Sequence, residues 1–153
     1  MCKRTTIAAL CMVMYLLPAS ADNGLTLPAH PGKVVVVDFW ASWCVPCRRS
    51  FPWMNEMQRK YGEDGLVIIG VNLDADATAA DEFLREVPAD FQIVRDPQGD
   101  LARSYNIIAM PSSVIFDRDG EIATRHNGFK VKKQDEYEAL LADLLKRPEG
   151  EQR

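Results

Sequence analysis

The sequence is poor in the residues that mark disordered, fibrous or repetitive chains. It has only 9 glycines and 9 prolines among 153 residues, whereas 47% of its residues are hydrophobic. This composition predicts a packed globular domain and excludes collagen-like and low-complexity chains. The sequence also has no excess of basic residues, because 18 lysines and arginines stand against 22 aspartates and glutamates. We therefore expect no nucleic-acid partner and no surface that binds anionic membranes.

The chain also lacks an apolar run of the length that spans a bilayer. Residues 7–17 are apolar and uncharged, but a membrane-spanning helix needs about 20 such residues. The run follows two basic residues and precedes the small residues that end at Ala21, which is the pattern of a secretory signal peptide. We predict a signal peptide over residues 1–21 and a periplasmic mature protein. An uncleaved membrane anchor and a lipoprotein attachment at Cys11 are the alternatives.

Cysteine is scarce once this signal peptide is set aside. Two of the four cysteines lie within it, so the mature chain keeps only Cys44 and Cys47. A structural zinc site needs four cysteine or histidine ligands, usually as two pairs. Only His30 and His126 could complete such a set, and they are isolated from each other in the sequence. We therefore expect no metal and no cofactor beyond a redox-active disulfide between Cys44 and Cys47.

The hydrophobic pattern predicts one α/β domain over residues 22–146, followed by a polar tail at 147–153. The expected elements, in chain order, are a strand at 34–40, a helix at 44–61, a strand at 66–73, a helix at 78–87, a short strand at 92–94, a short helix at 99–105, strands at 114–117 and 121–126, and an amphipathic helix that includes 137–145. This order predicts a mixed central β-sheet flanked by helices, with parallel strands first and an antiparallel hairpin last.

The cysteine pair lies where the first predicted strand meets its helix. Unpaired backbone N–H groups and the positive end of the helix dipole favour an anion there, so we expect Cys44 to ionise more readily than a free cysteine. Cys47 lies one turn further into the helix, where it can displace a mixed disulfide. This spacing predicts dithiol–disulfide exchange. A purely structural disulfide is the alternative, although a bridge that closes so short a loop stabilises a fold little.

The residues around the pair resemble the thioredoxin superfamily. Trp-Cys-Val-Pro-Cys at 43–47 follows Val-Asp-Phe-Trp-Ala at 37–41, and Met-Pro stands at 110–111. Three further segments are similar to the TlpA/ResA-like branch of exported thiol-disulfide oxidoreductases, namely 70–74, 105–107 and 111–120. The similarity extends from about residue 32 to residue 145. It implies a thioredoxin-like fold.

The resemblance also implies roles for individual residues. Cys44 would be the nucleophile and Cys47 the resolving thiol, while Pro111 would be a cis-proline that faces the pair. A cis bond there would leave the backbone of Met110 free to pair with an extended substrate. We expect Trp43, Pro46, Met110 and Pro111 to bind substrate. A trans turn proline at position 111 is the alternative.

The sequence departs from the TlpA/ResA-like pattern in two places. Many members of that branch carry an acidic residue three positions after the second cysteine, where this chain has Ser50. Asp38 instead interrupts the first strand, at the place of the buried aspartate of thioredoxins. Burial should raise its pKa, and our hypothesis is that Asp38 exchanges a proton with Cys47. A local hydrogen-bonding role without catalysis is the alternative. Only residues 22–33 precede the first strand, so an N-terminal hairpin common in that branch should be short or missing.

The resemblance implies a periplasmic oxidoreductase that reduces disulfides in cysteine-containing exported proteins, with a role in cytochrome c or oxidase maturation. A DsbD- or CcdA-type membrane protein would supply its electrons, and we expect the protein to be a monomer. A dithiol oxidase, a disulfide isomerase and a non-catalytic binding module on the same fold are the alternatives.

Overall fold

The computed structural model describes residue 27, residues 29–148 and residue 150. The predicted signal peptide over 1–21, the start of the following segment and part of the predicted tail lie outside these residues. Among the described residues, every helix is too short or too polar to span a lipid bilayer.

A five-stranded mixed sheet forms the centre of the molecule, in the order β3-β2-β1-β4-β5. The strands are β1 (Val34–Trp40), β2 (Leu66–Asn72), β3 (Gln92–Arg95), β4 (Ser112–Phe116) and β5 (Ile122–Asn127). The first three are mutually parallel, and β4 is antiparallel to both β1 and β5. The predicted mixed sheet and its terminal hairpin are confirmed.

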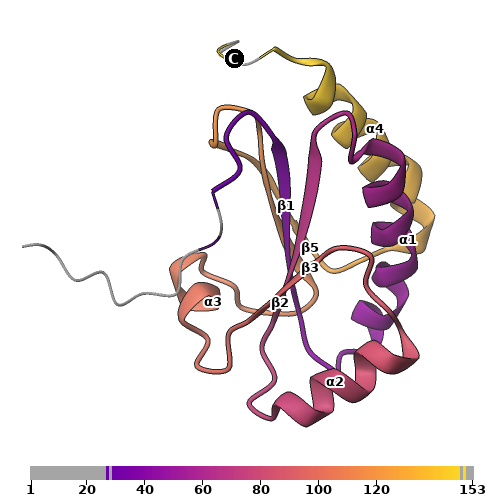
Figure 1. Ribbon diagram of the computed structural model, residues 1–153, viewed down its shortest axis with the longest axis vertical. Helices are drawn as coiled ribbons and strands as arrows, with labels where there is room; N and C mark the ends of the chain where they lie inside the picture. The colour runs from indigo at the N-terminus through magenta and orange to yellow at the C-terminus, as the bar shows by residue number, and fades with distance from the viewer. Residues whose placement is uncertain (1–26, 28, 149, 151–153) are drawn as a thin grey trace, which may run out of the picture.

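Helices cover both faces of this sheet (Figure 1). They are α1 (Val45–Tyr61), α2 (Ala77–Glu86), α3 (Asp100–Ser104) and α4 (Gln134–Lys146), with a 3₁₀ turn, η1, at Val131–Lys133. Side chains of α1, α2 and α4 share one core cluster, whereas α3 packs into a second cluster on the opposite face. The 3₁₀ turn was not predicted, and the first helix begins one residue later than expected because Cys44 is its N-cap.

The central strand β1 is buried on both faces, as its continuous apolar run predicts. Successive side chains of a strand point to opposite faces, so its residues divide between the two clusters. Val34, Val36 and Trp40 belong to the α1 side, and Val37 and Phe39 belong to the α3 side. By this alternation Asp38 points to the α1 side, the same side as the two cysteines.

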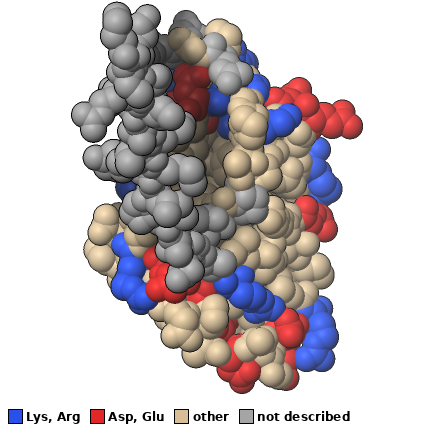
Figure 2. Space-filling view, turned by 60° about the vertical axis from the view of Figure 1, so that its left-hand side comes forward, with Lys and Arg blue, Asp and Glu red and all other residues tan. Residues whose placement is uncertain are grey.

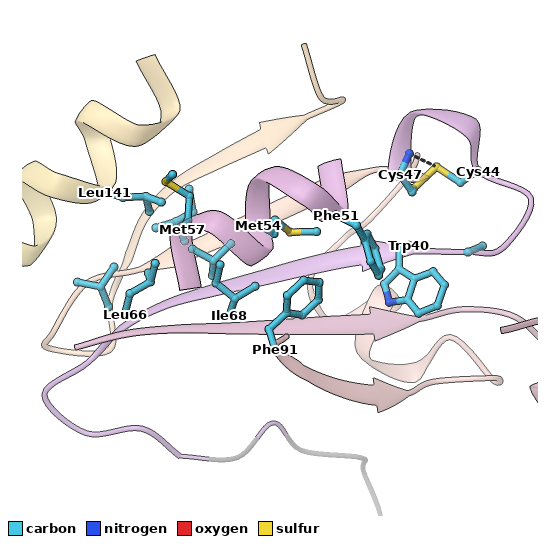
Figure 3. Close-up of a cluster of buried hydrophobic side chains, with 14 of the residues drawn as sticks. Trp40, Cys44, Cys47, Phe51, Met54, Met57, Leu66, Ile68, Phe91 and Leu141 are labelled. Atoms are coloured by element: carbon cyan, nitrogen blue, oxygen red, sulfur yellow. Dashed lines mark hydrogen bonds between the residues drawn. A yellow bond between two sulfur atoms is a disulfide. The ribbon is translucent and has the colours of Figure 1, made fainter. Parts of the chain in front are cut away.

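Helix α1 begins with the redox pair and continues into the main core (Figure 3). Pro46 lies in its first turn, where a missing N–H breaks no helical hydrogen bond. Phe51 is fully buried, and its ring centroid lies 5.0 Å from that of Trp40, 5.0 Å from that of Phe83 and 5.2 Å from that of Phe91. This aromatic cluster fixes the start of α1 against the end of β1.

Arg118 joins three parts of the chain that are distant in sequence. Its guanidinium donates hydrogen bonds to the backbone carbonyls of Gly32 at 2.7 Å, Asp64 at 2.9 Å and Leu145 at 2.8 Å. Gly32 precedes β1, Asp64 precedes β2, and Leu145 lies at the C-terminal end of α4. On the face shown in Figure 2, basic and acidic side chains of the described residues are interspersed, without a patch of one sign.

Candidate active site

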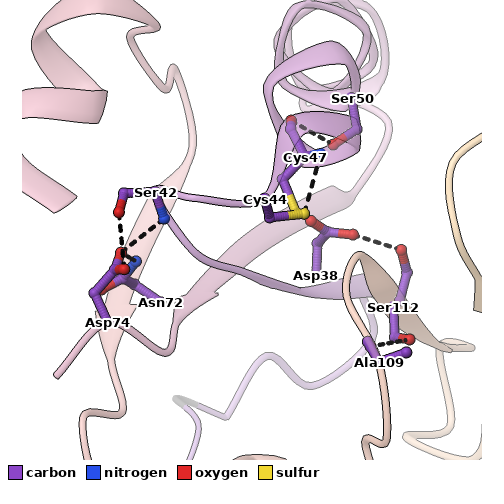
Figure 4. The surroundings of a disulfide bond; sticks show 10 residues. Asp38, Ser42, Cys44, Cys47, Ser50, Asn72, Asp74, Ala109 and Ser112 are labelled. Carbon is purple, nitrogen blue, oxygen red and sulfur yellow. Dashed lines mark hydrogen bonds between the residues drawn. A yellow bond between two sulfur atoms is a disulfide. The ribbon is translucent and has the colours of Figure 1, made fainter. Parts of the chain in front are cut away.

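Cys44 and Cys47 form a disulfide at the N-terminus of α1 (Figure 4). Cys44 is the N-cap residue, and its sulfur accepts a hydrogen bond from the backbone N–H of Cys47 at 3.3 Å. Both residues are buried, Cys47 completely and Cys44 to all but 4% of its surface. One backbone N–H of the first turn of α1 therefore points at the sulfur of Cys44, in the position where the sequence analysis expected an anion to be favoured.

The cysteine loop and the loop that contains Met110 and Pro111 meet at one end of the inner strands β1 and β4. β1 leads directly into the cysteine loop, and β4 begins immediately after Met110 and Pro111. Because β1 and β4 are antiparallel, with Phe39 opposite Ser112, the end of β1 and the start of β4 lie together. The Met110–Pro111 peptide bond is cis, which agrees with the resemblance. Pro111 is buried, and the partly buried Met110 packs against the cluster that contains both cysteines.

The residues that flank the disulfide are apolar and exposed. Trp43 exposes 70% of its surface and Val45 exposes 63%, and Pro46 between the cysteines is also exposed. Ile108, in the loop that leads to Pro111, exposes 90%. Trp43 and Val45 thus expose large apolar side chains immediately before and after Cys44, a feature typical of surfaces that contact other proteins.

Asp38 is buried beside this site with only 2% of its surface exposed. Its Oδ1 accepts a hydrogen bond from the hydroxyl of Ser113 at 2.6 Å. Its Oδ2 has no hydrogen-bond partner among the described residues. Burial raises the pKa of Asp38 from 3.8 to about 7, although the hydrogen bond from Ser113 opposes the increase. A carboxyl group with this pKa can both accept and donate a proton near neutral pH.

A hydrogen-bond network that the sequence analysis missed holds the cysteine loop in place (Figure 4). Asp74 accepts hydrogen bonds from the backbone N–H and the hydroxyl of Ser42, at 2.8 and 2.9 Å, and from the side chain of Asn72 at 2.7 Å. Asn72 in turn accepts from Arg95 on β3, which pairs with Asp81 on α2. The motif at 70–74 was the available signal, but its sequence does not indicate the contact with Ser42.

Ser50 stands three positions after the second cysteine, where the resemblance led us to compare it with an acidic residue. It is 2% exposed, and its hydroxyl donates to the backbone carbonyl of Cys47 at 2.9 Å. The neighbouring Arg48 pairs with Glu86 on α2 at 2.8 Å. The position after the cysteine pair therefore contributes a neutral helix contact. Asp38 differs from Asp74, the other buried carboxylate beside the cysteine loop, because one of its oxygens has no hydrogen-bond partner among the described residues.

The described residues include no group of three or more histidine, cysteine, aspartate or glutamate side chains that could hold a metal ion. His126 belongs to β5, whereas His30 precedes β1 and lines a separate cavity with Val35 and Val37. The two histidines therefore do not form a ligand set with the cysteine pair.

Comparisons with known proteins agree with this geometry. The family model described as Redoxin matches residues 13–141. The thiol-disulfide oxidoreductase ResA of Bacillus thuringiensis subsp. konkukian (strain 97-27) is 35% identical over 114 residues, which cover 74% of this chain and 66% of that protein. The chain thus spans just under two thirds of this curated relative.

Solved structures show the same fold. A putative thiol:disulfide interchange protein DsbE from Chlorobium tepidum is 45% identical, with a TM-score of 0.74 over 76% of this chain and 82% of that chain. StoA from Bacillus subtilis is 27% identical, with a TM-score of 0.61 over 71% of this chain and 84% of that chain. A putative thioredoxin from Neisseria meningitidis, 17% identical, shares the fold with a TM-score of 0.70 over 79% of this chain and 80% of that chain. The expected thioredoxin-like fold is confirmed.

Proposed function

This chain belongs to the Redoxin family, and we propose that it is a thiol–disulfide oxidoreductase that uses Cys44 and Cys47 as its redox pair. The observation that carries the proposal is the Cys44–Cys47 disulfide at the start of α1, beside the cis-proline loop and exposed apolar side chains. The names of the relatives ResA and DsbE support it.

The exchange would proceed in two steps from the reduced protein. The Cys44 thiolate attacks one sulfur of a substrate disulfide and forms a mixed disulfide, and the released substrate thiolate takes a proton from solvent. Cys47 then gives its proton to the carboxylate of Asp38, and its thiolate attacks the sulfur of Cys44. The bond between Cys44 and the substrate breaks, the second substrate sulfur leaves as a thiolate that takes a proton from solvent, and the Cys44–Cys47 disulfide forms. Two electrons have then passed to the substrate. An external dithiol reverses these steps and reloads the pair.

Substrate would bind as an extended segment across the end of the sheet where the cysteine loop and the cis-proline loop meet. Trp43 and Pro46 would contact it on the cysteine side, and the backbone of Met110 would pair with it beside Pro111. The exposed surfaces of Trp43 and Ile108 support this arrangement. The partners would be exported proteins whose cysteines must be reduced, such as proteins of cytochrome c or oxidase maturation. The reaction would take place in the periplasm on a monomer, with electrons from a DsbD- or CcdA-type membrane protein.

Insulin reduction with dithiothreitol as the electron source tests the activity. We expect wild-type protein to accelerate the reaction and Cys44→Ser to abolish the acceleration. Cys47→Ser is the matched control, because it also removes the disulfide but should accumulate a mixed disulfide detectable by mass spectrometry. Full activity in Cys44→Ser would refute the proposal.

A redox titration against glutathione tests the direction of electron flow. A reduction potential of about −270 mV, the value of thioredoxin, supports a reductase. A potential of about −120 mV, the value of DsbA, would overturn that direction in favour of an oxidase.

A further inference from the structure

A row of three polar residues crosses the sheet from the buried aspartate to the edge strand. The register places Asp38 of β1 opposite Ser113 of β4, and Ser113 opposite His126 of β5. Residues directly opposite one another in antiparallel strands point to the same face, with Cβ atoms about 4.5–5.5 Å apart. The three side chains therefore follow one another on the α1 side of the sheet, and β5 is one of its two outer strands.

A small cavity lies over this row. It has a volume of about 30 Å³, and its lining includes Asp38, Ser113 and His126 from the sheet and Trp53 and Tyr137 from the helices above. Asp38 Oδ2 and Trp53 Nε1 are both buried without a hydrogen-bond partner in the described part of the chain. A cavity of about 10–15 Å³ suffices for one water molecule when polar partners are present. This cavity has both the room and the unpaired polar atoms.

His126 connects the cavity to the molecular surface. The same residue lines an open groove of about 340 Å³, and its ring lies 4.8 Å from the ring of Tyr137 on α4. The other groove residues are Arg125 and Asn127 of β5, Lys130, Lys133 of η1, and Glu136 of α4. Lys133 donates to Glu136 at 2.7 Å, so its charge is partly compensated. His126 thus has the buried Asp38 on its inner side and charged, hydrated groups on its outer side.

We propose that Ser113 and His126, with one water molecule in the cavity, carry the proton of Asp38 to and from the surface groove. This relay rests on the proposed function, because oxidation of the pair delivers a proton from Cys47 to Asp38, and reduction of the pair returns one from Asp38 to Cys47. The carboxyl of Asp38 gives its proton to the water or to the Ser113 hydroxyl. Whichever of the two accepts it then passes a proton to a ring nitrogen of His126. The imidazolium then releases a proton to solvent in the groove. One proton leaves the protein, and no electron moves.

The electrostatics of His126 suit this task. Burial and the positive charge of Lys133 lower the pKa of His126, so its ring is neutral near pH 7 and can accept a proton. The groups that face it are Asp38 and Ser113 across the cavity, Tyr137 against its ring, and Arg125, Lys130, Lys133 and Glu136 around the groove.

Single-turnover oxidation of the reduced protein in weak buffer at pH 7 tests the relay. This pH lies near the pKa of Asp38, about 7, and a protonated Asp38 must release its proton before it can accept that of Cys47. Reduced protein is mixed with insulin, and tryptophan fluorescence follows formation of the disulfide. We expect His126→Ala to slow the oxidation of molecules with a protonated Asp38 about tenfold, below the effect of a direct acid–base group because solvent still reaches Asp38 slowly. Imidazole, which can fill the space left by the ring, should restore the rate. His126→Phe keeps the packing against Tyr137 and should be equally slow, without rescue by imidazole.

His30→Ala is the matched control, because this histidine lines a cavity with Val35 and Val37 on the other face of the sheet. It should oxidise at the wild-type rate. The reduction potential of the His126 variants should equal that of wild type, since a relay changes a rate and not an equilibrium. Wild-type rates in both His126 variants, or a slow His126→Ala that imidazole does not rescue, would overturn the relay alone. A wild-type protein that does not react with insulin would refute the proposed function and the relay with it.

Discussion

The buried carboxyl of Asp38 should make the stability of the protein depend on pH in a direction unusual for an acidic residue. The unfolded chain would lose this proton near pH 3.8, whereas the folded protein keeps it until about pH 7. Between these values the unfolded state binds fewer protons than the folded state, so the free energy of unfolding falls as pH rises. The decrease is complete above about pH 7. At 1.36 kcal/mol for each tenfold change in affinity, it amounts to about 4 kcal/mol.

Asp38→Asn isolates this effect. The asparagine carbonyl can still accept the hydrogen bond that Ser113 donates to Asp38 Oδ1, so the variant loses the charge but keeps the contact. Relative to wild type, the variant should therefore gain about 4 kcal/mol between pH 4 and pH 8. The lowered pKa values of Glu138 and His126 act in the opposite sense, because their contributions are lost as pH falls. Subtracting the two profiles removes these contributions.

Urea denaturation of the oxidised protein, followed by tryptophan fluorescence at several pH values, measures the difference. For a slope of about 2 kcal/mol per molar urea, the midpoints of variant and wild type should diverge by about 2 M from pH 4 to pH 8. Asp64→Asn, at an exposed aspartate, controls for the chemical change itself. Wild-type and Asp38→Asn profiles that stay parallel within about 1 kcal/mol would refute the reasoning that burial controls this carboxyl.

Three further predictions concern the scaffold, and urea denaturation measures each of them. Asp74→Ala removes the acceptor of both Ser42 hydrogen bonds, so we expect the free energy of unfolding to fall by about 3 kcal/mol and insulin reduction to slow. The control Asp76→Ala, which removes only the N-cap of α2, should cost about 1 kcal/mol and leave the rate unchanged. Phe51→Ala opens the aromatic cluster and should cost about 4 kcal/mol, and a loss below 1 kcal/mol would contradict the packing. Arg118→Met leaves three backbone carbonyls without their donor and should lower the free energy of unfolding by about 2 kcal/mol. Unchanged stability would show that the three hydrogen bonds of Arg118 contribute nothing.

The sequence predicted most of the elements because their signals are local. The apolar run at 34–40 is a strand buried on both faces, and the stripe at 137–145 lies on a helix that packs against the sheet, as expected. Errors appear at the boundaries, where capping decides. The helix expected over 78–87 spans Ala77–Glu86 because Asp76 caps it, and the strand expected over 114–117 begins at Ser112.

The candidate site was predictable only in part, for a related reason. Two cysteines three residues apart at a strand–helix junction are a local pattern, and the structure joins them in a disulfide at the N-terminus of α1. The contacts of Asp38 and Asp74 were not predictable, because their partners Ser113 and Ser42 lie 75 and 32 residues away in the chain. Which of several hydroxyl groups meets a carboxylate depends on strand order and register, which no local pattern encodes.

Local patterns in the chain were enough to predict the α/β architecture, the position of the redox pair and a carboxylate inside the central strand, because hydrophobic period, helix capping and cysteine spacing act over a few residues. Three relations became visible only in the folded protein: Asp38, Ser113 and His126 form one row, this row borders a cavity, and Asp74 holds the cysteine loop. These relations arise when strands far apart in the chain pair in one register, because pairing then brings their polar groups together. Once buried, these groups can form hydrogen bonds only with one another.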